Sequence, residues 1–101
     1  MFKNGMRPVH PGEILMDDCI KPMGVRVRAV AIALSVSCSR LSEITKGQRG
    51  ISADTALRLK RYFGSEAQRW LSLQSAFDLR VAESAAGKKI ANKMKPLSVT
   101  D

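Results

Sequence analysis

The sequence predicts an all-α fold of five helices in one small domain. The chain has 101 residues, which is enough for one such domain and little more. It is 45% apolar but only 5% aromatic, a balance that suits small packed helices better than a β-rich core. Apolar residues also recur at the i, i+3, i+4, i+7 spacing that places them on one face of a helix: Val27, Val30, Ala31 and Leu34.

We divide the chain into an extended lead-in over 1–9, a helical domain over 10–84 and a basic, disordered tail over 85–101. The first helix is expected to begin at His10, because Pro11 suits the first helical position and Glu13 places negative charge in the first turn. It ends near Pro22. The residues that it directs inward are Ile14, Leu15 and Cys19. We interpret His10 as a helix-start residue rather than a catalytic one.

The second and third helices are short and joined by a tight turn. The second covers about 26–34, and the turn lies at Ser35 and Val36. Ser37 is expected to cap the third helix, which ends at Lys46 and Gly47. Its buried residues, three positions apart, are Leu41 and Ile44. This arrangement is the helix-turn-helix pattern of DNA-binding domains.

The fourth and fifth helices complete the domain. Ser52 is the expected cap of the fourth helix, with Asp54 in its first turn and Gly64 at its end. Its inner face holds Ala56, Leu59 and Phe63. Ser65 and Gln68 have the spacing of a capping box, which predicts that the fifth helix starts there and runs to about Ser84.

The fifth helix carries more apolar residues than one face can hold. Since one face is enough for the domain's own core, the surplus predicts a symmetric dimer joined through this helix. The residues assigned to the interface are Trp70, Leu71, Leu73, Phe77 and Leu79. Of these, Trp70 and Phe77 are expected to pack partly within their own chain, with Leu71 and Leu79 nearer the partner. Alternatively, Leu71 or Leu79 is an ordinary exposed apolar residue.

The tail from Ala85 shows no sustained apolar period, which is the basis for predicting disorder. It contributes to a formal charge of +8, from 17 Lys and Arg against 9 Asp and Glu. Residues 1–84 alone carry +5, so the domain itself is basic. This excess favours a polyanionic partner, although a basic protein with no such partner would show the same charge.

The outer face of the third helix is polar, as a helix in the DNA major groove requires. Ser37 and Ser39 are hydrogen-bonding residues without strong base preference. Arg40 can bond guanine O6 and N7, and Glu43 can accept from cytosine N4. Cations that suit phosphates lie at Arg26, Arg28, Lys46 and Arg49. The alternative is a polar face that is merely solvated.

The sequence excludes most enzyme classes and offers no cofactor or metal site. It has no G-x-S-x-G segment, no phosphate-binding glycine loop and only one imidazole, His10. Cys19 and Cys38 are too few and too far apart for a zinc site. No apolar run approaches the roughly 20 residues that cross a membrane, and the first residues lack the apolar core of a secretory signal. We therefore expect a cytoplasmic protein that is not an enzyme.

Four blocks between His10 and about Glu83 form a recognisable pattern: 10–15 (HPGEIL), 36–44 with VS and SRLSEI, 50–59 (GISADTALRL) and 64–79 with GS, WLSLQ and FDL. On these blocks the chain resembles the HigA/VapI-type antitoxins of the XRE helix-turn-helix superfamily. The resemblance implies a lambda-repressor-like five-helix dimer that binds a palindromic operator in double-stranded DNA, represses its own operon and neutralises a small ribonuclease toxin. The alternative is a stand-alone XRE-type repressor with no toxin partner.

Three positions depart from the superfamily pattern. Val27 stands where a glutamine usually binds a phosphate, and Cys38 replaces a common proline. Ser35 stands where the turn usually has glycine, and a non-glycine residue at positive φ costs roughly 1 kcal/mol or more. These departures predict weaker operator binding, which Arg26 and Arg28 can offset through phosphate contacts.

Overall fold

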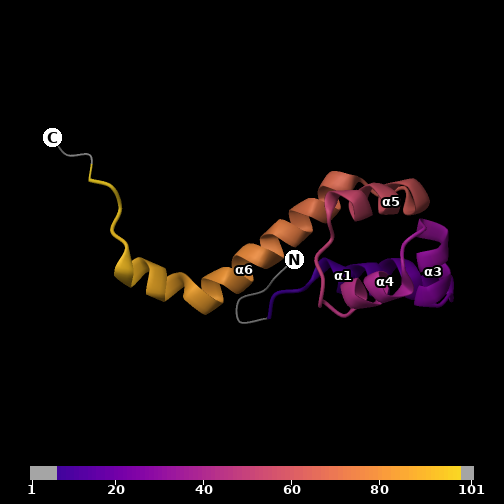
Figure 1. Ribbon diagram of the computed structural model, residues 1–101, viewed down its shortest axis with the longest axis horizontal. Coiled ribbons are helices and arrows are strands. Elements are labelled where there is room, and N and C mark those ends of the chain that lie inside the picture. The colour runs from indigo at the N-terminus through magenta and orange to yellow at the C-terminus, as the bar shows by residue number, and fades with distance from the viewer. Residues whose placement is uncertain (1–6, 99–101) are drawn as a thin grey trace.

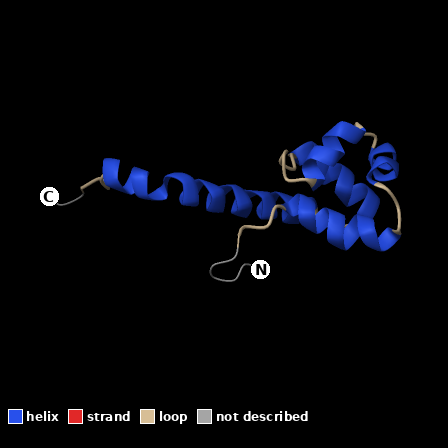
Figure 2. Cartoon of the chain, turned by 90° about the horizontal axis from the view of Figure 1, so that it is seen from below, coloured by secondary structure: helices blue, strands red, loops and turns tan. Residues whose placement is uncertain are grey.

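The computed structural model describes residues 7–98, and their regular structure is entirely helical (Figures 1 and 2). The elements in chain order are α1 (Pro11–Ile14), the π-helical η1 (Leu15–Ile20), α2 (Lys21–Met23), α3 (Val27–Leu34), α4 (Cys38–Thr45), α5 (Ala53–Phe63) and α6 (Ala67–Lys93). The first three segments follow one another without a break and form the first expected helix. The prediction of five helices is therefore confirmed.

α1 begins as its sequence predicts. His10 is the N-cap residue, and its Nδ1 accepts a hydrogen bond of 2.9 Å from the backbone N–H of Gly12. The imidazole is only 4% exposed and meets the ring of Phe77 edge-on, with 4.8 Å between ring centroids. His10 is thus part of the packed structure at the start of the helix. Residues 7–9 of the lead-in are not helical, and residues 1–6 lie outside the described part of the chain.

η1 changes which residues the first helix buries. A π-helical turn bonds residue i to residue i+5, so residues five apart lie nearly above one another. Leu15 and Ile20 are five apart, and both are fully buried. Ile14 and Cys19, which we expected to face inward, are only partly buried against the core. The sequence pattern missed Ile20 because it assumed a regular α-helical period.

α3, α4 and α5 supply most of the core and follow the expected pattern. Buried side chains from these helices include Val30, Ala31, Leu34, Leu41, Ile44, Ala56 and Leu59. Ser37 and Ser52 cap α4 and α5 by accepting hydrogen bonds from Arg40 N and Thr55 N. Gly64 ends α5 in the left-handed conformation. Local cap chemistry and helical periodicity therefore agree with the tertiary packing.

The start of α6 differs from the prediction. Glu66 is the N-cap residue and makes no side-chain cap bond, so the expected capping box does not form. Ser65 Oγ instead accepts a hydrogen bond of 2.7 Å from Trp70 Nε1, while Gln68 Nε2 donates to Ser72. Because the buried indole N–H needs a partner, it takes the hydroxyl that would otherwise cap the helix.

α6 also continues well past the predicted end. The expected boundary near Ser84 and the disordered tail are wrong up to Lys93, where the helix ends. Alanine and lysine are good helix formers and hold this segment in a helix without an apolar stripe. The helix projects from the domain (Figures 1 and 2), and the Cα radius of gyration is 17.1 Å against about 13 Å for a compact chain of this length. Within residues 7–98, no helix is long and apolar enough to cross a membrane.

Burial lowers the pKa of His10 below its ordinary value, and this links folding to pH. The unfolded chain binds a proton more readily than the folded one, so stability is full above about pH 6.5 and falls as the pH drops below that value. We expect a lower melting temperature at pH 5.5 than at pH 7.5. His10→Asn keeps a capping side chain without this titration, so its melting temperature should change less. The same pH dependence in both proteins would contradict the assignment.

Ser35 occupies the left-handed region, with φ 58° and ψ 43°, at the C-terminal end of α3. Ser35→Gly removes the steric penalty of a Cβ in that conformation, so we expect it to raise the free energy of unfolding by about 1 kcal/mol. Ala33→Gly is the matched control because it adds the same residue inside the helix, where glycine destabilises. Urea denaturation of both variants should give effects of opposite sign. A loss of stability in Ser35→Gly would show that strain at this turn is not relieved by glycine.

Candidate nucleic-acid interface

α4 is the candidate recognition helix, and its polarity follows the prediction. Leu41 and Ile44 are fully buried and fix the helix to the core. Ser37 and Ser39 are exposed, as is Lys46 just past the helix end. The Ser37 hydroxyl is also committed to the helix start, since it accepts from Arg40 N at 3.0 Å. The helix thus has one anchored stripe and one polar face available to a ligand.

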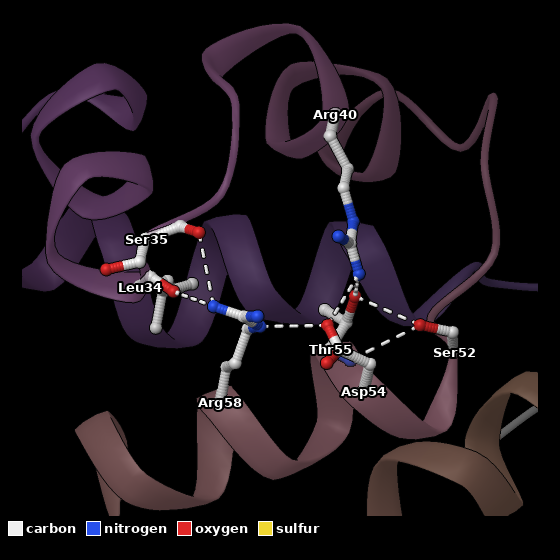
Figure 3. Close-up of polar contacts among 7 residues, drawn as sticks. All are labelled: Leu34, Ser35, Arg40, Ser52, Asp54, Thr55 and Arg58. Atoms are coloured by element: carbon white, nitrogen blue, oxygen red, sulfur yellow. Dashed lines mark hydrogen bonds and ion pairs between the residues drawn. The ribbon is translucent and has the colours of Figure 1, made fainter.

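Arg40 does not point away from the domain as expected. Its Nη2 donates to Thr55 Oγ1 at 2.6 Å and to Asp54 Oδ2 at 3.0 Å, both on α5 (Figure 3). Its side chain is accordingly only 30% exposed. The carboxylate and the hydroxyl draw the guanidinium toward α5, and the arginine links the recognition helix to the next helix.

Asp54 joins this link to the turn between α3 and α4 (Figure 3). Its Oδ2 also accepts from Arg58 Nε at 2.8 Å, while Arg58 Nη1 donates to the carbonyl oxygens of Leu34 at 2.8 Å and Ser35 at 3.1 Å. Arg58, and after it Arg40, hold the pKa of Asp54 below its ordinary value. We call Arg40, Asp54, Thr55 and Arg58 the α5 clamp, because together they tie α5 to both helices of the helix-turn-helix.

Sequence reasoning missed most of the α5 clamp. It placed Asp54 only as a favourable charge at the start of a helix. The i, i+4 spacing of Asp54 and Arg58 was a readable signal for an ion pair on one helix face. The contacts of Arg40 with residues 14 and 15 positions later leave no local signal.

The opposite end of α4 is held by α1. A Cβ on Gly12 would overlap the carbonyl oxygen of Ile44, so only glycine allows this approach of the two helices. Gly47 follows α4 with φ 76° and faces the His10 ring. The recognition helix is therefore fixed at both ends, by the α5 clamp near its start and by α1 near its end.

The loop after α4 is held by α6. Gln74 is buried and its Oε1 accepts from the backbone N–H of Ile51 at 2.8 Å. A Cβ on Gly50 would lie 3.2 Å from the carboxamide carbon of Gln74, which explains the small residue at that position. Gln74 was not identified from the sequence, because a polar residue on an apolar helix shows no partner until the fold brings one to it.

The remaining predicted DNA-binding residues are distributed over three places. Glu43 and Arg49 pair with each other, with 2.8 Å between Arg49 Nε and Glu43 Oε1. Arg26 and Arg28 are exposed at the start of α3, and Val27 between them is half-buried. The cations thus lie at the start of α3 and in the loop that follows α4.

The predicted dimer residues divide into two groups. Trp70 is 4% exposed and belongs to the domain core, and Phe77 packs on His10. Both residues therefore make contacts within their own chain, as we expected for part of their surface. Leu71 and Leu73 are half-buried against the same core, which places Leu71 closer to its own domain than we expected. Leu79 is 61% exposed.

The described residues contain no group of three or more side chains arranged to hold a metal ion. Cys19 and Cys38 are both free thiols. Burial raises the pKa of Cys19, which keeps that thiol protonated. Cys38 is exposed at the first position of α4.

No family model matches the chain. It is 55% identical over 96 residues to virulence-associated protein I of Dichelobacter nodosus, covering 95% of this chain and 87% of that protein. Its structure is similar to that of Pseudomonas aeruginosa antitoxin HigA with the higBA promoter, with 47% identity, a TM-score of 0.87 and coverage of 91% and 100%. For antitoxin GraA in complex with its operator, the values are 43% identity, a TM-score of 0.85 and coverage of 98% and 100%. The chain therefore belongs to the HigA/VapI-type antitoxins, a non-enzymatic family of helix-turn-helix regulators of the XRE type.

Proposed function

We propose that this protein is an antitoxin that binds the operator of its own operon through α4 and neutralises a small ribonuclease toxin. The observation that carries the DNA part is the anchoring of α4 at both ends, with a polar outer face and the exposed cations Lys46 and Arg49 just past its end. Similar proteins support it, since HigA was solved with the higBA promoter and GraA in complex with its operator. The protein would bind both operator and toxin in the cytoplasm.

In the bound state, Ser37, Ser39, Arg40 and Glu43 face base edges, and Arg26, Arg28, Lys46 and Arg49 face phosphates. Arg40 must leave both Asp54 and the buried Thr55 hydroxyl to reach a guanine. The carboxylate then keeps Arg58 as its partner, and the Thr55 hydroxyl keeps Ser52. An exposed ion pair contributes little, whereas a bidentate contact with guanine is worth about 1–3 kcal/mol. Breaking the pair with Asp54 therefore opposes DNA binding only weakly.

Arg40→Ala should weaken operator binding by about 1–3 kcal/mol and relax specificity at one base pair, because it removes a base contact. Lys46→Ala should weaken binding to operator and random duplex alike, since a phosphate contact carries no sequence information. Gel-shift titrations on both duplexes measure the two effects.

Asp54→Asn is the control for the structural role of Arg40, since it weakens the α5 clamp and leaves the arginine in place. It should keep more operator selectivity than Arg40→Ala. If Arg40→Ala lowers the affinity for operator and for random duplex equally, Arg40 does not contact a base.

We further propose that the protein binds DNA as a two-fold dimer joined through α6. One recognition helix makes few base contacts, so useful affinity generally needs two half-sites about 34 Å apart. The exposed side chain of Leu79, at the point where α6 leaves the domain, supports a partner helix there. Val81 is a second exposed apolar residue on this stretch.

Leu79→Glu should dissociate the dimer and abolish tight operator binding, because it places a charge in an apolar interface. Helical content should stay the same, since the side chain is exposed within its own chain. Leu57→Glu is a matched control: Leu57 is 60% exposed but lies on α5. Sedimentation at micromolar concentration and operator titration test both variants. A wild-type monomer with full operator affinity would refute the dimer.

The toxin partner distinguishes an antitoxin from a stand-alone repressor, the alternative function. The first helix and the residues before it are the proposed contact, because a cationic C-terminal segment fits a basic ribonuclease poorly. Co-expression with the product of a short, basic neighbouring reading frame tests this. Rescue of growth together with co-purification would support the antitoxin. Operator binding without rescue and without co-purification would favour the stand-alone repressor.

A further inference from the structure

The second half of α6 contributes no buried residue to the domain core. The buried residues of α6 are Trp70 and Gln74, both in its first half. From Leu79 to Ser98, which we call the arm, every described residue is exposed except the half-buried Arg80, Ala86 and Gly87. The arm is helical up to Lys93 and extends away from the other helices (Figure 2). Packing against the domain core therefore does not account for this exposed helical surface.

The arm leaves the domain beside the candidate DNA-binding loop. Phe77 packs on His10, whose ring also faces Gly47, directly after Lys46. One turn earlier, Gln74 holds Ile51 at the other end of the same loop. In Figures 1 and 2, α6 begins at the domain and its second half extends away from the other helices. The base of the arm therefore lies beside the loop that follows α4, and the arm continues outward from there.

The charge on the arm is concentrated at its far end. Between Ala85 and Ser98 there is no acidic residue, and the four cations are Lys88, Lys89, Lys93 and Lys95. All four are exposed. Lys89 and Lys93 are four residues apart and share a helix face. At 1.5 Å per residue, Lys88 lies roughly 16 Å and Lys93 roughly 24 Å beyond Phe77.

We propose that the arm is a second DNA-contacting element that binds the phosphate backbone through these lysines. The inference rests on the proposed operator binding and extends it to a site outside the helix-turn-helix. Duplex DNA carries one charge per roughly 1.7 Å of axis, so the lysines meet a regular row of phosphates. Lysine acts there as a point charge, and the contact adds affinity without reading sequence. Ile90 and Met94 are the bulky apolar side chains among Ala85–Met94, too few for the broad apolar face that a membrane-surface helix needs.

The salt dependence of DNA binding tests this directly. The probe is a 40-base-pair duplex (about four helical turns) of random sequence, because the proposed contact is sequence-independent. We expect Lys89→Gln with Lys93→Gln to lower the slope of log K against log salt by about two for each protomer of the bound dimer, since each lost phosphate contact removes about 0.9. Glutamine retains helix propensity, and circular dichroism checks that the arm stays helical. The matched control is Lys60→Gln with Arg61→Gln, two exposed cations on α5, which should leave the slope unchanged.

Two outcomes overturn the proposal. One is a slope in the arm variant equal to that of the wild type. The other is an equal reduction in the α5 control, which would show an effect of net charge. If the arm variant loses binding to single-stranded RNA but keeps its DNA slope, the arm serves another polyanion and the proposal also fails. The proposed function has a separate test: it fails if the wild type does not prefer its operator over random duplex. In that case the salt slope on random duplex still decides whether the arm contacts DNA.

Discussion

Near its start, α4 is tied to α5 and to the preceding turn through one carboxylate, Asp54, that two arginines share. α4 has eight residues and is too short to be a stable helix by itself, so tertiary contacts must hold it. Arg40 ties it to Asp54, and Arg58 ties the same carboxylate to the turn before it. Because the tie to α4 and the tie to the turn meet at Asp54, the two helices of the helix-turn-helix are placed relative to α5 as one unit.

The α5 clamp also explains how the turn functions without glycine. Ser35 is held in the left-handed region, which is unfavourable for a residue with a Cβ. Arg58 donates to the carbonyl oxygens of Leu34 and Ser35, groups that the end of α3 leaves without helical partners. The strained residue is thus stabilised by a charged donor from another helix. The departure from the family pattern at this turn changes the local conformational energy and leaves the architecture intact.

The sequence predicted those features that depend on neighbours along the chain. The caps Ser37 and Ser52 and the buried Leu41 and Ile44 could be found because cap spacing and helical period are local. The partners of Arg40 and Gln74 could not, since they lie 14, 15 and 23 residues away. The length of α6 was missed for a different reason. Apolar periodicity reports burial, and the part of α6 from Ala85 onward has no buried residue and therefore no period to read.

The helical state of the arm changes what its lysines can do. A disordered basic tail must lose conformational freedom when it binds, and this ordering opposes the attraction between charges. In the structure, Lys88, Lys89 and Lys93 are already fixed along a helix whose base is held by Phe77 on His10. The same contact joins the base of the arm to the end of α4, through His10 and Gly47. The position of the base of the arm relative to the recognition helix is therefore set before DNA is met.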